Sequence, residues 1–236
     1  MNSKVSIRSS RADCNENRSA DVQRKAKVRL GESSDSSLFR LFLSFNPSPE
    51  VVRHLGQAQR ALRRLLQHAY GTELPIRWAR SFQFHLTVLF FGNMSITKTD
   101  SIQARLARVV GEHPEFPCLT ANGFGCFPAF RRPRVLWMGF ASSPLLQIWQ
   151  DRLAKAFEGD LAGKDKDRSY PHVTLARLNF QRLPARFGER LFVLAQEAGL
   201  PSWDWQIDSI SLMRSIPGPK GSEYICLVTL PGTHIS

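Results

Sequence analysis

The feature that most constrains this chain is a short strand-like motif that occurs twice. "HLTVLFFG" begins at His85, and "HVTLARLN" begins at His172. Each segment has a histidine, one apolar residue, a threonine and then a further apolar run. Because successive side chains of a strand point to opposite faces, His85 and Thr87 share one face, and so do His172 and Thr174. The apolar residues between them face the other way, so we expect them to anchor each strand to a core.

The two motifs lie at matching places in a degenerate repeat. Each half is predicted to contain, in order, a strand, a helix that begins at a Ser-Pro pair, the motif strand and a second helix. In the first half these are a strand over 40–45, a helix from Ser48-Pro49 to Gly71, the strand at His85 and a helix over about 100–111. In the second half they are a strand over 134–140, a helix from Ser143-Pro144 to Gly159, the strand at His172 and a helix over about 184–198. Serine caps a helix well and proline suits its first turn, so both Ser-Pro pairs are helix starts.

Two further strands close the chain and complete the predicted fold. They are "QIDSISLMRS" and "EYICLVTL", separated by the turn-rich "IPGPKGS", and they are expected to complete one of the sheets. The fold class predicted is α+β, with two lobes related by approximate two-fold symmetry. Each lobe has a mainly antiparallel sheet with helices on its outer face, and the two histidine–threonine faces meet in a groove between the lobes.

Residues 1–37 differ from the rest of the chain. They are polar, rich in serine and without an aromatic residue, so they bury too little apolar surface to offset the entropy of ordering. We predict a disordered tail over 1–37 and a two-lobed domain over 38–236.

The charge balance and the cysteines suggest the partner and the compartment. There are 32 Lys and Arg residues against 20 Asp and Glu, a formal net charge of +12, which favours a polyanionic partner such as nucleic acid. The four cysteines show no C-x-x-C spacing, which is typical of free thiols in a reducing compartment. There is no apolar run of the roughly 20 residues that span a bilayer, and the N-terminus lacks the apolar core of a signal peptide. We therefore expect a cytoplasmic protein that is not bound to a membrane, and we expect a monomer.

Two imidazoles and two hydroxyls suit phosphoryl chemistry. Histidine titrates near neutral pH, so one ring can act as a base while the other, protonated, acts as an acid. In-line displacement at phosphorus needs these two groups on opposite sides of the reacting atom. Threonine hydroxyls can donate to the non-bridging phosphate oxygens, where negative charge must be stabilised.

A zinc site and a non-catalytic binding module are the competing interpretations. Zinc needs three or four ligands, and the other four histidines lack cysteine or carboxylate neighbours at ligand spacing: His54, His68, His113 and His234. We therefore predict neither a metal nor a cofactor. In an RNA-binding module whose histidines have no catalytic role, we would expect another residue at one of the four polar positions of the motifs, whereas both histidines and both threonines are present.

With both motifs in this context, the chain resembles the two-histidine phosphoesterase superfamily, and within it the RNA 2′,3′-cyclic phosphodiesterases formerly called 2′-5′ RNA ligases. The resemblance runs from about Arg40 to Pro231. It is carried by "RLFLSF", "RW" at Arg77-Trp78, "HLTVLFFGN", "PRVLWMGF", "YPHVTLARL" and "SLMRS" followed by "EYICLVTL". One departure is "RSFQ" before His85, where the family commonly has a "PPEN"-like stretch.

The resemblance implies an activity and roles for the motif residues. It implies hydrolysis of an RNA 2′,3′-cyclic phosphate to a 2′-phosphate without a required metal. His85 is implied as the proton donor to the leaving 3′ oxygen, and His172 as the base that activates water. The same two histidines and two threonines could serve related reactions on cyclic nucleotides, 2′-5′ oligonucleotides or RNA 3′ ends, including reverse 2′-5′ ligation. These reactions remain alternatives for this protein.

Supporting residues for RNA binding are expected around the motifs. Arg177 follows the second motif and suits a phosphate, although strict alternation places it on the face opposite His172 unless the strand has a bulge. A basic cluster before the strand at 134–140 is a candidate for tracking an RNA backbone: Arg131, Arg132 and Arg134. Three aromatic residues are candidates for stacking on a base, namely Phe127, Phe130 and Tyr170.

Overall fold

Nine antiparallel strands of the computed structural model form one hydrogen-bonded sheet. The structure describes residues 38–161, 170–199, 202–218 and 221–232. Along the sheet the strands follow the order β7 (Asp204–Gln206), β4 (Cys118–Phe127), β5 (Val135–Phe140), β6 (His172–Leu178), β3 (Leu86–Ser95), β1 (Leu38–Phe45), β8 (Ser209–Ile216) and β9 (Glu223–Pro231). The short strand β2 (Ile76–Trp78) pairs with the free part of β6. The tail predicted over 1–37 lies outside the described residues, so the domain boundary stays a prediction.

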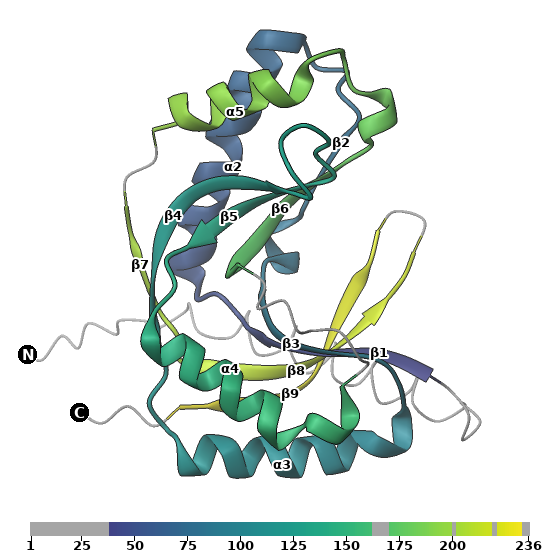
Figure 1. The fold of residues 1–236 in the computed structure, drawn as a ribbon, viewed down its shortest axis with the longest axis vertical. Helices are drawn as coiled ribbons and strands as arrows, with labels where there is room; N and C mark the ends of the chain where they lie inside the picture. The colour runs from purple at the N-terminus through teal and green to yellow at the C-terminus, as the bar shows by residue number, and fades with distance from the viewer. Residues whose placement is uncertain (1–37, 162–169, 200–201, 219–220, 233–236) are drawn as a thin grey trace, which may run out of the picture. The chain divides into compact units, whose positions relative to one another are not determined.

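The sheet has two halves that are joined at a single residue pair. β3 and β6 pair only through Leu86 and Val173, whereas the neighbouring strand pairs extend over several residues. Figure 1 shows the two halves spreading apart from this junction, with β4, β5 and β6 on one side and β1, β3, β8 and β9 on the other. The two predicted lobes are therefore present, and the two motif strands are the ones that connect them.

Two helices begin where the Ser-Pro pairs predicted. α2 (Pro49–Tyr70) starts after Ser48, whose hydroxyl accepts from the backbone N–H of Val51 at 3.3 Å. α4 (Pro144–Ala156) starts after Ser143, whose hydroxyl accepts from Leu146 at 3.2 Å. The remaining helices among the described residues are α3 (Thr99–Glu112), α5 (Phe187–Glu197) and four short 3₁₀ helices, η1 (Ser81–Gln83), η2 (Ile96–Lys98), η3 (Glu158–Asp160) and η4 (Phe180–Arg182). α4 ends three residues before Gly159, and that glycine lies inside η3.

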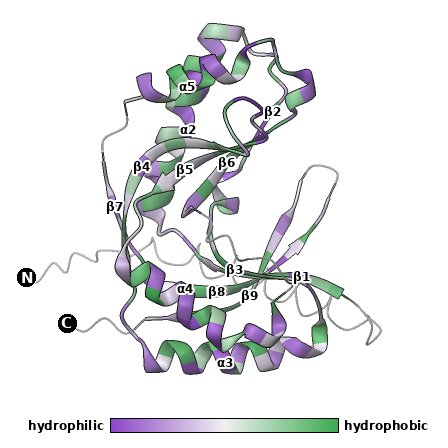
Figure 2. Ribbon diagram, viewed as in Figure 1, coloured by the Kyte–Doolittle hydropathy of each residue, from purple (hydrophilic) through white to green (hydrophobic). Residues whose placement is uncertain are grey.

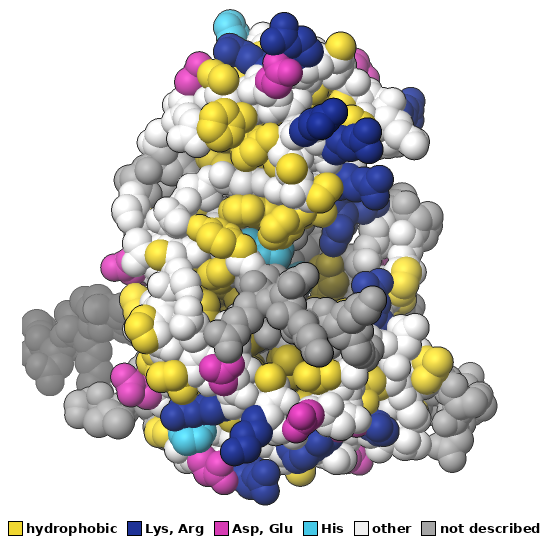
Figure 3. Space-filling view, in the orientation of Figure 1, with side chains coloured by type: hydrophobic (Ala, Val, Ile, Leu, Met, Phe, Trp, Pro, Cys, Tyr) yellow, Lys and Arg dark blue, Asp and Glu magenta, His cyan; other side chains and the backbone are white. Residues whose placement is uncertain are grey.

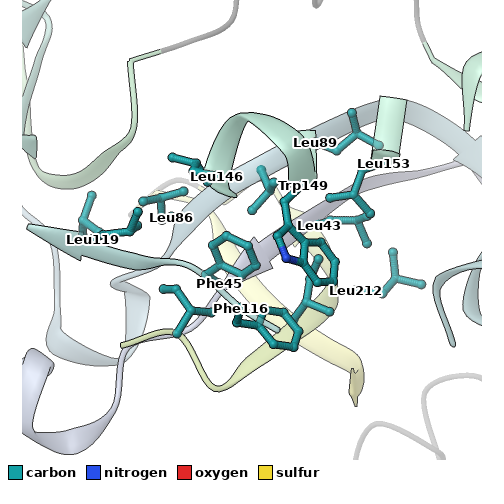
Figure 4. Packing of buried hydrophobic residues seen from close by; sticks show 14 of the residues in the cluster. Leu43, Phe45, Leu86, Leu89, Phe116, Leu119, Leu146, Trp149, Leu153 and Leu212 are labelled. Atoms are coloured by element: carbon teal, nitrogen blue, oxygen red, sulfur yellow. The ribbon is translucent and has the colours of Figure 1, made fainter. Parts of the chain in front are cut away.

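Both Ser-Pro helices reach across to the other repeat. α4 packs its Leu146, Trp149 and Leu153 against Leu43 of β1 and Leu89 of β3 (Figure 4). The apolar periodicity of a helix predicts which of its faces is buried, but it does not predict which sheet covers that face.

The second half of α2 makes the reciprocal crossing. Its Leu62 and Leu66 lie in a cluster with Leu136 of β5, Ala176 of β6 and Leu191 of α5. Both helices are amphipathic, and Figure 2 shows hydrophobic and hydrophilic residues interspersed along each of them. No helix in the described part of the chain is long and apolar enough to cross a membrane.

A prediction about stability follows from the packing of α5. A Cβ atom added at Gly188 would lie 1.6 Å from the carbonyl oxygen of Phe130. Because the obstacle is backbone, Gly188→Ala should destabilise the fold by about 3 kcal/mol, the upper end of the cost of overpacking. Gly111 in α3 has nothing within 4 Å of such an atom, so the control Gly111→Ala should stabilise by roughly 0.5–1 kcal/mol. Urea unfolding of both variants measures the difference, and equal stabilities would contradict this packing.

Candidate active site

The junction between β3 and β6 brings the two motifs together. Leu86 and Val173 are paired and fully buried, so the residues on either side of them point to the other face. Because the strands are antiparallel, His85 lies towards Thr174, and Thr87 lies towards His172. All four polar side chains line one groove of about 430 Å³. The shared groove predicted from the repeat is therefore present, with the two histidines diagonally opposite each other.

A β-bulge in each motif strand turns the following residues towards the groove. In β6, Thr174 pairs with Trp137 of β5 and Ala176 pairs with Leu136 of β5. Leu175, between them, has no partner in β5 and is the extra residue of the bulge. One extra residue reverses the later alternation, and Arg177 accordingly lines the groove. The strand thus has the bulge that Arg177 needs in order to face the groove together with His172.

β3 carries the matching bulge. Ser44 and Leu43 of β1 pair with Thr87 and Leu89, which leaves Val88 extra. Phe90 therefore takes the position in this half that Arg177 takes in the other, and it also lines the groove. The repeat is symmetric in its backbone but not in its chemistry.

The two imidazole rings are oriented in the same way. The Nδ1 atom of His85 lies 2.8 Å from the carbonyl oxygen of Gln83, and Nδ1 of His172 lies 2.8 Å from that of Tyr170. A carbonyl oxygen only accepts, so each Nδ1 carries a proton and donates it. In the neutral ring Nε2 then bears the lone pair, which is available for a proton of the substrate or of water.

Burial of the rings lowers both of their pKa values. Removal from water is the main reason that the pKa of His85 falls to about 4; the hydrogen bond to the Gln83 carbonyl opposes the shift, and the positive charges of His172 and Arg177 add to it. The pKa of His172 is also lowered, first by burial and then by Arg177, while the Tyr170 carbonyl opposes the shift. Burial therefore favours the neutral form of both rings in the free protein. A bound anion would raise both pKa values, because it favours the charged form of each ring.

Aromatic side chains pack against each ring. His85 meets Tyr224 edge-on at a centroid distance of 4.6 Å and Phe42 at 5.1 Å. His172 meets Phe127 at 4.9 Å and Trp137 at 5.9 Å.

Of the three predicted stacking candidates, two lie near the groove. Phe127 contacts His172 directly, and Tyr170 packs on Trp137 at 5.2 Å. Phe130 instead packs against Phe192 at 5.1 Å, among residues that do not line the groove.

Sequence reasoning missed several groove residues. Arg40 and Arg77 line the groove with Arg177, and the guanidinium of Arg40 lies 4.9 Å from the centre of the Phe90 ring. Tyr224 comes from β9, far from either motif in sequence. No Asp or Glu is among the described residues that line the groove. Nor does the described part of the chain bring three or more His, Cys, Asp or Glu side chains together as a metal site would.

The comparisons with known proteins agree with this architecture. A family model described as the 2'-5' RNA ligase superfamily matches residues 83–218. A protein of Aeropyrum pernix named RNA 2',3'-cyclic phosphodiesterase is 31% identical over 166 residues, which cover 69% of this chain and 90% of the relative. A protein of Thermotoga maritima with the same name is 25% identical over 191 residues, covering 78% of this chain and 91% of the relative.

Solved structures share the fold. The crystal structure of TT0787 of Thermus thermophilus has a TM-score of 0.61 at 24% identity, covering 83% of this chain and all of that one (100%). E. coli LigT complexed with 3'-AMP has a TM-score of 0.57 at 18% identity, covering 84% of this chain and 100% of that chain. With the family model, the relatives and the fold in agreement, the resemblance inferred from the paired motifs is confirmed: the chain belongs to the 2'-5' RNA ligase superfamily.

Proposed function

We propose that this protein hydrolyses RNA ends that carry a 2′,3′-cyclic phosphate and leaves a 2′-phosphate. The observation that carries the proposal is the groove in which both motif histidines lie together, each with Nδ1 bound to a backbone carbonyl. The names of the Aeropyrum and Thermotoga relatives support the reaction. The excess of Lys and Arg supports a nucleic acid as substrate.

The groove residues account for each proton and each bond of this reaction. Nε2 of His172 accepts a proton from water as the water oxygen bonds to phosphorus. The bond between phosphorus and the 3′ oxygen breaks on the opposite side, and Nε2 of His85 gives its proton to that oxygen. The product is a 2′-phosphate with a free 3′ hydroxyl. Two histidines placed diagonally across one groove provide the two sides that in-line displacement needs.

The assignment of donor to His85 follows the family resemblance. In the free protein the pKa of His85 is about 4, so this ring needs a bound anion before it carries the second proton. The cyclic phosphate is such an anion, and it also offsets the charge of Arg177 that lowers the pKa of both rings. Substrate binding and protonation of the donor are therefore coupled.

The two threonines should each contribute to the rate. We propose that their hydroxyls donate to the non-bridging oxygens, where charge builds up in the transition state. Replacing Thr87 or Thr174 by valine keeps the shape and removes the donor, so kcat should fall about 10- to 10²-fold. Thr→Ser at the same position keeps the hydroxyl and should retain most of the activity. Steady-state kinetics of the four variants tests this, and a valine variant as active as its serine counterpart would remove that threonine from phosphate binding.

Product analysis tests the proposed reaction. An oligoribonucleotide ending in a 2′,3′-cyclic phosphate, incubated with the protein in EDTA, should give the 2′-phosphate isomer, which is distinguished from the 3′ isomer by chromatography. The His172→Ala protein is the control for contaminating nucleases. No product from folded protein would contradict the proposal. A parallel panel of cyclic nucleotides and 2′-5′ oligonucleotides would show whether a related diester is the better substrate.

We also infer that one chain forms a complete site. Both histidines and both threonines come from the same chain, which supports the expected monomer, and light scattering would contradict it by giving the mass of a dimer. The three cysteines in the described residues are free thiols, namely Cys118, Cys126 and Cys226. They are compatible with the expected cytoplasmic location, which cell fractionation would test.

A further inference from the structure

A second cavity adjoins the groove and shares two of its arginines. It has a volume of about 480 Å³ and is lined by Pro75, Arg77, Arg134, Arg177, Leu178, Asn179, Phe180 and Gln181. Arg77 and Arg177 also line the groove that holds the histidines. The two hollows are therefore adjacent, with this pair of guanidinium side chains between them.

The strand pairing explains why three arginines converge here. Arg77 of β2 and Arg177 of β6 are paired residues, so their side chains lie on the same face, with the strands about 5 Å apart. Arg134 immediately precedes β5, on the other side of β6. Its N–H donates to Phe127 and its carbonyl accepts from Leu178, both at 2.8 Å, which fixes its backbone at the cavity.

These positive charges have no counter-charge among the described residues. No acidic side chain of the described chain lines either hollow, and none of the three arginines makes an ion pair with another described residue. The guanidinium of Arg77 instead lies against Gly221, where an added Cβ would be 3.1 Å from its Cζ atom. Figure 3 shows Lys and Arg side chains gathered down the side of the molecule where β2 and β6 lie. Like charges held together in this way favour a bound anion.

We propose that this second cavity binds the internucleotide phosphate that precedes the cyclic terminal nucleotide, so that the protein prefers an RNA strand to a cyclic mononucleotide. The inference rests on the proposed function, because that function places the cyclic phosphate beside Arg177 in the groove. Arg134 and Arg77 contact the next phosphate, and guanidinium groups match phosphate oxygens in a bidentate way.

The rest of the cavity suits a nucleotide without selecting its base. Phe180 is exposed at the cavity, and an aromatic face stacks on any base. Asn179 and Gln181 offer amide groups to the sugar or the phosphate. Contacts to the phosphate position the strand but carry no sequence information, so we expect a preference for chain length and not for sequence.

Two substrates with the same terminal nucleotide test this proposal. One is a 2′,3′-cyclic mononucleotide and the other is an oligoribonucleotide that ends in it. Wild-type protein should show a higher kcat/KM on the oligonucleotide. In Arg134→Gln the ratio of the two kcat/KM values should fall about 10- to 10²-fold, mainly through the KM of the oligonucleotide. A cyclic mononucleotide that carries a 5′-phosphate distinguishes a phosphate within a strand from a terminal phosphate. Its kcat/KM should exceed that of the unphosphorylated mononucleotide, but by less than the kcat/KM of the oligonucleotide does.

The matched control is Arg63→Gln, which removes one positive charge from an exposed position of α2 outside both hollows. Its ratio should equal that of the wild type. An Arg134→Gln ratio that also equals the wild-type value would overturn the proposal.

Binding measurements distinguish this inference from the proposed function. The probe is a fluorescent oligoribonucleotide that ends in a 2′-phosphate, which needs no turnover. Arg134→Gln should bind it about 10- to 10²-fold more weakly than wild type. The slope of log K against log salt concentration should be less steep by about one, because one fewer counterion is released on binding. If the protein hydrolyses neither substrate but Arg134→Gln still weakens binding, the proposed reaction is wrong, and binding of the internucleotide phosphate in the second cavity is supported. Equal binding of the probe by Arg134→Gln and wild type would contradict phosphate binding in the second cavity, whatever the catalytic result.

Discussion

Replacing His85 or His172 by alanine should lower kcat for hydrolysis of a 2′,3′-cyclic phosphate end by about 10²- to 10⁴-fold. Each ring presents Nε2 to the same groove because a backbone carbonyl 2.8 Å away binds its Nδ1. Loss of either ring removes one of the two proton transfers, and the remaining ring cannot act on both sides of the phosphorus. Single-turnover kinetics of the two variants measures the effect, and circular dichroism establishes that they are folded. Turnover that is unchanged in either variant would exclude that histidine from the mechanism.

A sulfur substitution separates the two roles. When sulfur replaces the 3′ oxygen of the cyclic phosphate, the leaving group departs as a thiolate and needs no proton. The loss caused by His85→Ala should then shrink to less than about tenfold, whereas the loss caused by His172→Ala should persist, because water still needs a base. The opposite result would exchange the roles of donor and acceptor.

Lowering the pH should destabilise the protein through His85. Its pKa is about 4 in the folded protein, against about 6.5 for an unperturbed histidine in an unfolded chain. The unfolded state therefore binds more protons between these values. The stability is fully present above pH 6.5 and is lost as the pH falls towards 4. For this ring the loss is on the order of 3 kcal/mol, and His172 adds a loss in the same direction.

The contribution of His85 is read from a difference between two proteins. The free energy of unfolding in urea is measured at pH 7.5 and at pH 4.5 for wild type and for His85→Gln, which cannot titrate. Carboxyl groups that titrate in this range affect both proteins alike, so the wild type should lose more stability than the variant by roughly 2–3 kcal/mol. The same loss in both would mean that the ring of His85 is as easily protonated in the folded state as in the unfolded one.

Local signals in the sequence predicted most of the elements that hold the site. The Ser-Pro pairs predicted the starts of α2 and α4, because capping is decided by the cap residue and the first turn. Alternation along each motif predicted which side chains of the motifs would face the groove. The predicted helix over 184–198 begins later, at Phe187.

Features that depend on partners distant in sequence were not predicted. β2, β4 and β7 were missed, since β2 and β7 have three residues each and β4, "CLTANGFGCF", has weak alternation. The bulges at Val88 and Leu175 exist only relative to β1 and β5, and so the place of Arg177 could not be fixed from β6 alone. The crossing of α4 onto β1 and β3, and the approach of Tyr224 to His85, likewise arise from tertiary packing.

NMR of the protein with ¹⁵N-labelled histidine tests most directly whether both imidazole rings contact one phosphate. The Nε2 signals of the two rings are assigned from the His85→Ala and His172→Ala proteins, and the wild type is then titrated with a nucleoside 2′-phosphate. Both Nε2 signals should move with a single dissociation constant, and both pKa values should rise on binding. A titration in which only one ring responds, or in which the two rings respond with different dissociation constants, would contradict the shared site.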